Sequence, residues 1–349
     1  MSEESTSTTA HLSVAMTTTN FDKIQTTGGD SMTSSSSRGA YFYFWCAAVV
    51  IGALGAAANA LVLYAMVVSK QHKKQLLIYN QNVFDLCSCL LLVLTYTLKL
   101  CNIYLTGTLG YWLCMMILNE GLLWSSVVGS RINLMSVTIE RYLKVVRPAC
   151  GKKLLRRPVR YAAIAFAWIS SIIYNMAVAF STSAVIDGVC YGFTVWESRV
   201  AKIIYGIWYF ISFFVIVVLT FIFCYGSIFV VLRRQAKVMA SHSGPGSSAS
   251  QSHSNHVQSN VAKTMVLICA LYVIMCTPEN VYYLLVNVST VLTLHESAYN
   301  VSLFTSIAFL YTSANPFIYA AKFEPVKRVL VGLIPCKEPQ QADRAVEMT

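Results

Sequence analysis

The sequence predicts an all-α membrane protein, in which seven transmembrane helices form a bundle and a short amphipathic eighth helix follows them. Composition is the first reason: the chain of 349 residues is 56% hydrophobic and only 12% charged, whereas a soluble domain has about 25% charged residues. The second is a set of seven apolar stretches, each as long as the roughly 20 residues that cross a bilayer as a helix. The third is an uneven distribution of positive charge between the loops.

Seven apolar stretches predict the transmembrane helices. They span Tyr41–Val68, Leu76–Leu100, Trp112–Val145, Val159–Ser181, Lys202–Leu232, Lys263–Val288 and Tyr299–Ala321. The next segment, Phe323–Ile334, is too short to cross a bilayer, but its apolar residues recur at helical spacing. Such a pattern is typical of a helix that lies on the membrane surface.

Polar segments predict three regions outside the spans. Residues 1–40 are rich in Ser and Thr and lack the apolar core of a signal peptide, so we expect a disordered extracellular tail. The membrane domain covers residues 41–334 and contains a third cytoplasmic loop at about 233–262, in which the Gly/Ser/His tract Ser241–Gln258 is expected to be a flexible linker. A short cytoplasmic tail covers residues 335–349.

Lysine and arginine residues favour one side of the membrane. Alternate loops and helix ends carry Lys70, Lys73, Lys74, Lys144, Arg147, Lys152, Lys153, Arg156, Arg157, Arg160, Arg233, Arg234 and Lys237. The intervening loops are nearly bare of charge, and residues 101–110 carry none. Because cytoplasmic loops are enriched in positive charge, we expect the N-terminus outside and the C-terminus in the cytoplasm. This asymmetry explains the net charge of +11 without a nucleic-acid partner.

Polar residues interrupt several of the apolar stretches. Asn59, Asp85, Ser130 and Asn133 lie within spans, and the seventh span contains the segment Asn315–Tyr319, which reads Asn-Pro-Phe-Ile-Tyr. Polar groups are costly in a membrane, and those that persist usually face the bundle interior and often carry function. A purely structural hydrogen bond between helices is the alternative for each of them.

The cytoplasmic end of the third span carries the triplet Glu140, Arg141 and Tyr142. The acid and the arginine can pair in a resting state, and Arg141 can then be released to another partner; an ordinary ion pair on one helix is the alternative. Pro278 and Pro316 kink the sixth and seventh spans, because proline removes a backbone donor. Kinks in neighbouring helices allow their cytoplasmic ends to swing, although a static kink is equally open.

Taken in order, these residues resemble the rhodopsin-like (class A) family of G-protein-coupled receptors. The matching positions are Asn59, Asp85, the Glu140-Arg141-Tyr142 triplet, Trp168, Tyr225, Pro278 and Asn315-Pro316-x-x-Tyr319. The resemblance implies a receptor at the plasma membrane, in which an extracellular ligand opens a cytoplasmic cleft for a heterotrimeric G protein. It implies no enzymatic activity. The switch residues that it implies are Glu140, Arg141, Tyr142, Tyr225, Pro278, Asn315, Pro316 and Tyr319.

The same resemblance implies further sites. A sodium ion would be held by Asp85, Ser130 and Asn315, with Asn59 nearby, and no other cofactor is expected. A disulfide would join Cys114 to Cys190, with Cys101 as another extracellular candidate. Arrestin and receptor kinases are further expected partners, beside the membrane lipid. Cys336 is a candidate for palmitoylation and Asn287 for glycosylation.

Several positions depart from the family pattern. The sixth span reads Met275-Cys276-Thr277-Pro278, so the usual tryptophan is absent, and Tyr272 stands where phenylalanine is usual. The fifth span has no proline near Val217 or elsewhere. We therefore expect a different activation relay, with high basal activity, a poor response to ligand, or a receptor-like partner that does not signal.

The sequence narrows the range of possible ligand classes mainly by excluding some of them. The lysine nearest to the seventh span is Lys322, directly after its inner end, which argues against an opsin. Gly121–Leu123 occupies the place where monoamine receptors carry an aspartate. The pocket candidates are Glu279, Asn280 and Tyr283, which share one helical stripe with Cys276, together with Glu120. We expect Glu279 to pair with a cationic group of the ligand, and hydrogen bonding to a neighbouring helix is the alternative.

A neuropeptide is the first candidate ligand, because the sequences of Leu77–Asp85 and Ile139–Val146 look like those of peptide receptors. A small molecule or a lipid acting on an orphan receptor is the second. A transporter is less favoured, because the sequence shows no internal repeat. A histidine-based membrane enzyme is disfavoured as well, because all six histidines lie in tails or loops.

Overall fold

The computed structural model describes residues 31–192, 198–241, 249–289 and 294–333. The chain divides into two units, Met1–Tyr43 and Phe44–Thr349. The described part of the first unit is helical. The second unit contains the helical bundle.

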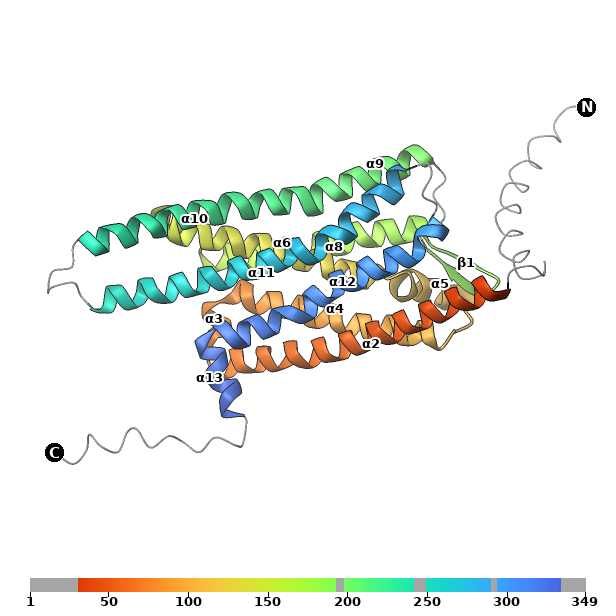
Figure 1. Cartoon of the computed structure of the whole chain (residues 1–349), viewed down its shortest axis with the longest axis horizontal. Coiled ribbons are helices and arrows are strands. Elements are labelled where there is room, and N and C mark those ends of the chain that lie inside the picture. Colours follow the sequence, from red (N-terminus) through yellow and green to blue (C-terminus); the bar gives the residue numbers. More distant parts are fainter. Residues whose placement is uncertain (1–30, 193–197, 242–248, 290–293, 334–349) are drawn as a thin grey trace, which may run out of the picture. The chain divides into compact units, whose positions relative to one another are not determined.

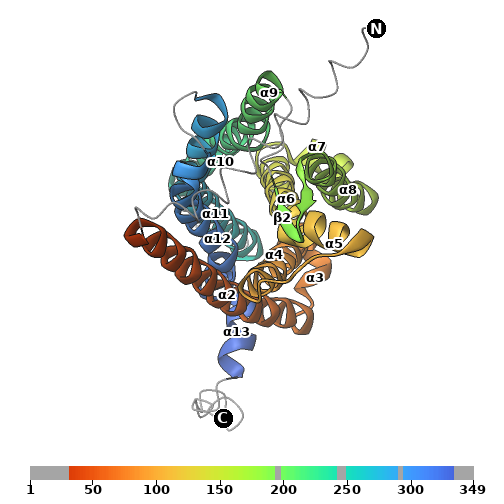
Figure 2. The ribbon, with the colours of Figure 1, turned by 90° about the vertical axis from the view of Figure 1, so that its right-hand side faces the viewer.

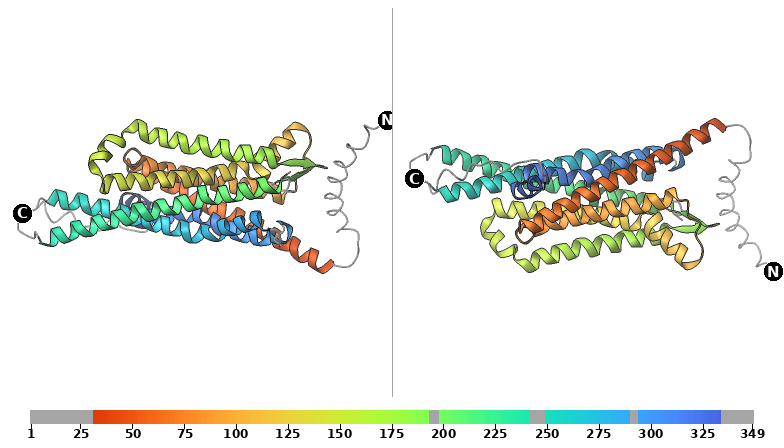
Figure 3. Two further views of the ribbon diagram at one scale, coloured as in Figure 1. Left: turned by 90° about the horizontal axis from the view of Figure 1, so that it is seen from above. Right: turned by 90° about the horizontal axis from the view of Figure 1, so that it is seen from below.

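Long helices run side by side through the second unit (Figures 1 and 3). Their bounds are α2 Ser31–Val68, α4 Leu76–Leu100, α6 Gly121–Val145, α8 Arg157–Thr182, α9 Arg199–Phe210, α10 Ile216–Ser241, α11 Ala249–Val288 and α12 Leu294–Lys322. A π-helical segment η2, Ile211–Val215, joins α9 to α10 into one membrane-crossing unit. The short helices are α3 Gln71–Lys74, α5 Gly107–Leu113, α7 Pro148–Leu154 and α13 Glu324–Gly332. This is the predicted seven-helix bundle, and α13 is the predicted amphipathic eighth helix, which turns away from the direction of α12 (Figure 1).

The faces of the helices match a membrane environment. Six helical segments of the described chain are long and apolar enough to cross a bilayer. Large apolar side chains point outward from them, and Leu54, Phe166, Ile222 and Ile274 are each more than 60% exposed. Patches of this kind are rare on soluble monomers but cost nothing against lipid. Helix α12 completes the seven and is the more polar one, since it carries Thr305, Thr312, Ser313 and Asn315.

Three helices, α2, α10 and α11, extend well beyond their predicted bounds. Helix α10 continues to Ser241 and α11 begins at Ala249, so much of the predicted third loop at 233–262 is helical, and residues 242–248 lie outside the described chain. The segment after Leu232 contains no Gly or Pro before Ser243, and its Arg, Gln, Ala, Lys and Met favour helix. Likewise α2 begins at Ser31, ten residues before the predicted start.

The predicted continuous span Trp112–Val145 is interrupted, which corrects the expectation. A π-helical segment η1, Cys114–Leu118, precedes a break at Asn119 and Glu120, where Glu120 adopts a left-handed backbone with φ of 63°. Gly121 then packs so closely that an added Cβ would lie 2.7 Å from the carbonyl oxygen of Met115. The extra residue in the π turn and the break displace Cys114 relative to a straight helix.

The bundle is held together at its centre by polar contacts between α4, α6 and α8. Asn133 accepts a hydrogen bond from Asn80 at 2.9 Å and donates to Gln81 Oε1 at 2.8 Å and to the carbonyl oxygen of Leu77 at 3.0 Å. Trp168 Nε1 donates to Asn80 Oδ1 at 3.2 Å. Asn133 therefore serves the structural role that was its alternative in the sequence.

Close packing surrounds this network. The Phe84 ring stacks on that of Trp168 with centroids 3.9 Å apart. Gly129 of α6 lies directly against Phe84, and a Cβ there would come within 2.3 Å of that ring. A larger residue at Gly129 would separate α6 from α4. Figure 2, which looks along the helices, shows α8 beside α6 at one side of the bundle.

A small hairpin covers one end of the bundle. Strands β1, Ala184–Ile186, and β2, Val189–Tyr191, pair antiparallel, with Val185 opposite Cys190. The connection Asp187–Gly188 has positive φ at both residues, 51° and 77°, as a two-residue hairpin turn requires. We call this the disulfide end of the bundle and the opposite end, which carries Arg141, the Arg141 end.

Candidate functional site

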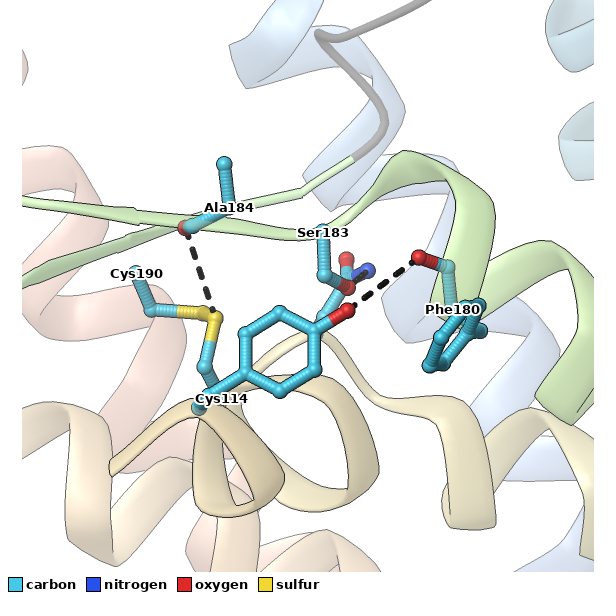
Figure 4. Close-up of a disulfide and its surroundings, with 7 residues drawn as sticks. Cys114, Phe180, Ser183, Ala184 and Cys190 are labelled. Atoms are coloured by element: carbon cyan, nitrogen blue, oxygen red, sulfur yellow. Dashed lines mark hydrogen bonds between the residues drawn. A yellow bond between two sulfur atoms is a disulfide. The ribbon is translucent and has the colours of Figure 1, made fainter. Parts of the chain in front are cut away.

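A disulfide anchors the hairpin to the start of the third transmembrane unit (Figure 4). Cys114 of η1 and Cys190 of β2 are bonded, with their Cα atoms 5.4 Å apart. Cys114 Sγ lies 3.7 Å from the carbonyl oxygen of Ala184 on the neighbouring strand. The predicted pairing is confirmed, and Cys101 is a free, exposed thiol.

Glu120 forms a compact charged cluster near the disulfide end. Its carboxylate accepts hydrogen bonds from Lys99 Nζ at 2.5 Å, Tyr96 Oη at 3.0 Å and Trp124 Nε1 at 3.0 Å. Lys99 and Glu120 retain 23% and 15% side-chain exposure. These contacts hold Glu120 in its left-handed backbone conformation, because the carboxylate joins the last turn of α4 to the first turn of α6. The predicted pocket residue Glu120 thus lies at the break between η1 and α6.

Glu279 is buried in the bundle and already has a cationic partner. Arg131 of α6 donates from Nη2 to Glu279 Oε2 at 3.4 Å and from Nη1 to Tyr209 Oη at 2.9 Å. Asn280 Nδ2 donates to the same Glu279 oxygen at 2.7 Å. The side chains of Arg131 and Glu279 are 2% and 5% exposed. Removing one member of such a pair leaves a buried charge, which costs about 3–5 kcal/mol.

Arg131 is the residue that the sequence analysis missed. It directly follows Ser130, and a cation within an apolar span is by itself a signal of function. Its partner on α11 is the same Glu279 for which a ligand cation was expected. The structure therefore realises the alternative, a contact with a neighbouring helix.

Aromatic side chains line the same stripe towards the disulfide end. The rings of Tyr205, Tyr209 and Tyr283 lie 5.3–6.5 Å apart between centroids. Of the predicted pocket residues, Tyr283 thus meets α9 and Asn280 contacts Arg131 of α6, whereas Glu120 belongs to the separate cluster with Lys99. The sequence grouped these candidates into one site, and the structure places them in two.

Asp85 lies at the polar centre of the bundle and is fully buried. Its Oδ1 accepts from Ser130 Oγ at 2.9 Å and from Gln81 Nε2 at 3.4 Å, and its Oδ2 accepts from Asn315 Nδ2 at 2.8 Å. Three predicted sodium-site residues are therefore in direct contact. Gln81 is an additional donor that the sequence did not indicate.

The oxygen atoms around Asp85 suit a hard cation. The Oδ1 atoms of Asn315 and Asn59 are buried and have no hydrogen-bond partner among the described residues. Asn59 itself donates to the carbonyl oxygens of Gly55 and Thr312 at 3.0 and 3.2 Å. Unpaired acceptors are costly in an apolar interior, and a small cation prefers oxygen ligands of this kind. The residues present fit a sodium ion held by Asp85, Ser130 and Asn315.

At the Arg141 end, the acid and the arginine of the triplet take different partners. Glu140 Oε1 lies 2.7 Å from Lys144 Nζ and 4.0 Å from Arg160 Nη1. Arg141 Nη2 instead donates to Gln75 Oε1, immediately before α4. The expected Glu140–Arg141 pair is thus replaced in the described chain by these contacts. Arg141 is still held inside the bundle, with only 6% of its surface exposed.

The other predicted switch residues gather near Arg141. Tyr225 Oη lies 3.4 Å from Thr138 Oγ1, one helical turn before Arg141. Tyr319 is buried in the same apolar core, and the Tyr142 ring contacts Phe223 at 5.6 Å between centroids. Pro278 and Pro316 lie inside α11 and α12, and Pro316 follows directly on the asparagine bound to Asp85.

The two modification candidates fare differently. Asn287 is buried, donates to the carbonyl oxygen of Tyr283 at 2.7 Å, and packs against Gly206. A glycosylated asparagine needs an exposed amide, so this position is poorly placed for modification. Cys336 lies outside the described residues.

Comparison with known proteins agrees with this geometry. The family model described as seven-transmembrane receptor (rhodopsin family) matches residues 58–319. The fold is similar to the crystal structure of squid rhodopsin, with a TM-score of 0.68 and 17% sequence identity, over 86% of this chain and 88% of that chain; at this identity the likeness concerns the fold. No curated protein matches the sequence. Since the family model covers well over half of the chain, the protein belongs to the rhodopsin family of seven-transmembrane, G-protein-coupled receptors, which are not enzymes.

Proposed function

We propose that the receptor binds its ligand in the half of the bundle nearer the disulfide end and activates a heterotrimeric G protein at the Arg141 end. The observation that carries this proposal is a series of three separate buried polar clusters, placed one after another between the two ends. Arg131 and Glu279 lie on the ligand side, Asp85 and Asn315 at the centre, and Arg141 at the far end. Ligand and G protein would then bias one two-state bundle, and each would raise the affinity for the other.

The proposed orientation places the disulfide end outside the cell and the Arg141 end in the cytoplasm of a plasma-membrane receptor. Exposed lysines and arginines of α3, α7 and the start of α8 support it, because they lie on the loops of the Arg141 end. The disulfide supports it too, since such bonds persist in an oxidising compartment. Arrestin and receptor kinases would act at the same cytoplasmic end.

Replacing Arg141 with alanine is expected to abolish basal G-protein activation. Among the described residues, the guanidinium of Arg141 donates a hydrogen bond to the neutral side chain of Gln75, so no carboxylate has to be displaced before it contacts a G protein. Activation would be measured without added ligand, in cells that express equal surface amounts of each variant. Arg328→Ala, which removes an 83% exposed arginine of α13, should retain the wild-type signal. Undiminished signalling by Arg141→Ala would refute the assigned role.

Sodium chloride is expected to stabilise the receptor through Asp85. A ligand that binds only the folded state adds RT ln(1 + [L]/Kd) to its stability, so the unfolding midpoint should rise with sodium at constant ionic strength, balanced by choline. Asp85→Asn keeps the shape but removes the charge and should abolish the sodium response. An equal rise in wild type and variant would show that sodium acts elsewhere. Gln81 Nε2 must then leave Asp85 Oδ1 for the ion to bind.

For the ligand, we propose a peptide with a cationic group that competes with Arg131 for Glu279. The tyrosines of α9 and α11 around Glu279 offer faces that attract cations. A library of basic peptides, screened against wild type and Glu279→Gln, tests this. Equal potency on both would leave a small molecule or lipid as the better candidate. A second candidate function is a receptor with high basal activity, or a partner that does not signal. It is favoured by Cys276, which stands at the position of the family's tryptophan.

A further inference from the structure

The ion pair between Arg131 and Glu279 is one of the few links between α6 and α11. Helix α11 packs chiefly against α12 and α9, and only marginally against α6. Arg131 bridges this gap with two hydrogen bonds to α11, to Glu279 Oε2 at 3.4 Å and to Asn280 Oδ1 at 3.5 Å. It also reaches α9 through Tyr209. A single buried cation thus joins three helices.

The same guanidinium lies across the stripe of α11 that lacks the tryptophan. Its Cζ atom is 5.9 Å from the ring centroid of Tyr272, one turn to one side of Cys276, and its Nη atoms reach Glu279 and Asn280, one turn to the other side. Cys276 is itself buried and small. Arg131 therefore takes up the position against α11 that a bulky side chain at residue 276 would need.

The ion pair lies at a position on α11 where it restrains the direction of the helix. Glu279 directly follows Pro278, which interrupts the backbone hydrogen bonds of the helix. A restraint beside the kink controls the direction of the whole segment on its other side. Leu267 precedes Pro278 by eleven residues, so it lies roughly 16 Å from the proline along the helix, towards the Arg141 end.

We propose that Arg131 is a positioning residue of the receptor: through Glu279 it holds α11 against α6 in the resting arrangement, and loss of the ion pair releases the Arg141 end of α11 about Pro278. This rests on the proposed function and deepens it, because it assigns the restraint on α11 to the Arg131–Glu279 pair at which the ligand is proposed to act. Activation then consists of separating Arg131 from Glu279, whatever ligand does so. The aromatic switch of the family is replaced here by a buried ion pair.

The test measures the position of α11 directly. Spin labels would be placed at Arg157→Cys on α8 and Leu267→Cys on α11, both exposed in the structure, with Cys101, Cys150 and Cys336 replaced by serine. The distance between the labels in the full-length receptor, in lipid nanodiscs, is compared for wild type, Arg131→Met and Glu279→Gln. Both single variants should shift the distance distribution to longer values. Basal G-protein activation should rise roughly fivefold or more, as a coupling of typical size predicts.

Charge exchange separates an ion pair from mere packing. The double variant Arg131→Glu with Glu279→Arg should restore the wild-type distance, and Arg131→Lys should restore part of it, because both keep an attraction between α6 and α11. As a control, Ser126→Ala removes a buried polar contact of α6 with Phe84 of α4 and should leave the distance unchanged.

Two outcomes would overturn the proposal: a wild-type distance in Arg131→Met, or an exchanged pair that is as open as the single variants. Should the single variants fail to fold, the neutral pair Arg131→Met with Glu279→Gln, which buries no net charge, decides in the same way. A longer distance without any G-protein signal would support the restraint and count against the proposed coupling instead.

Discussion

Replacing Cys114 or Cys190 with serine is expected to remove most of the folded receptor from the cell surface. The bond closes a loop with a sequence separation of 76 residues, and the loss of such a disulfide typically costs about 2–5 kcal/mol. The surrounding structure cannot compensate, because η1 is separated from α6 by the break at Glu120 and the hairpin has only two short strands. Both elements therefore depend on each other.

Surface amounts of a receptor tagged at its N-terminus, measured by flow cytometry against total protein, would check this. Cys101→Ser is the matched control, since it removes an exposed free thiol at the same end of the bundle. The double variant with serine at both positions should resemble each single variant. Surface amounts close to wild type in all three would show that the helices alone determine this end of the molecule.

Asn133→Leu is expected to destabilise the bundle by about 2–5 kcal/mol, because it deletes three hydrogen bonds worth roughly 0.6–1.7 kcal/mol each between membrane helices. The partners are Asn80, Gln81 and the carbonyl of Leu77, and the residues around them are tightly packed. The amides of Asn80 and Gln81 would lose their hydrogen bonds to Asn133 in a buried region, where water cannot replace them. We therefore expect a loss of stability in the upper part of this range.

Thermal unfolding with a thiol-reactive fluorophore suits this measurement, because Cys89, Cys224, Cys269 and Cys276 are buried and become reactive only on unfolding. The midpoint should fall by about 5 °C or more at 2–4 °C per kcal/mol. Ser136→Ala is the control, since among the described residues its hydroxyl bonds to the carbonyl of Ile132 on its own helix and to no other helix. If both variants unfolded at the same temperature, the network around Asn133 would not be what joins α4 to α6.

Local sequence properties determined the architecture of this receptor. Apolar length alone located the spans and placed α4 and α8 within two residues of their observed bounds, because a bilayer leaves no other way to satisfy the backbone, whereas α10 and α11 extend well beyond the predicted spans. Amphipathic spacing located α13, and the match with the family located Asp85, Ser130, Asn315 and the Cys114–Cys190 bond. The helices depend on residue type and order along one chain segment, which a sequence displays directly, whereas the site around Asp85 and the disulfide join distant segments and were implied only by the resemblance to the family.

Only the tertiary structure decided how these segments meet. The break at Glu120 depends on Lys99 from α4, and the partner of Glu279 is Arg131 from α6, so neither could be read from the helix that carries it. Glu140 and Arg141 are adjacent in sequence, yet they bind Lys144 and Gln75, because neighbours on a helix point in different directions. In a membrane bundle, the partner of a buried polar side chain is set by which helices lie next to each other. Those distances between helices arise only when the chain folds, so they cannot be read from the sequence of one helix.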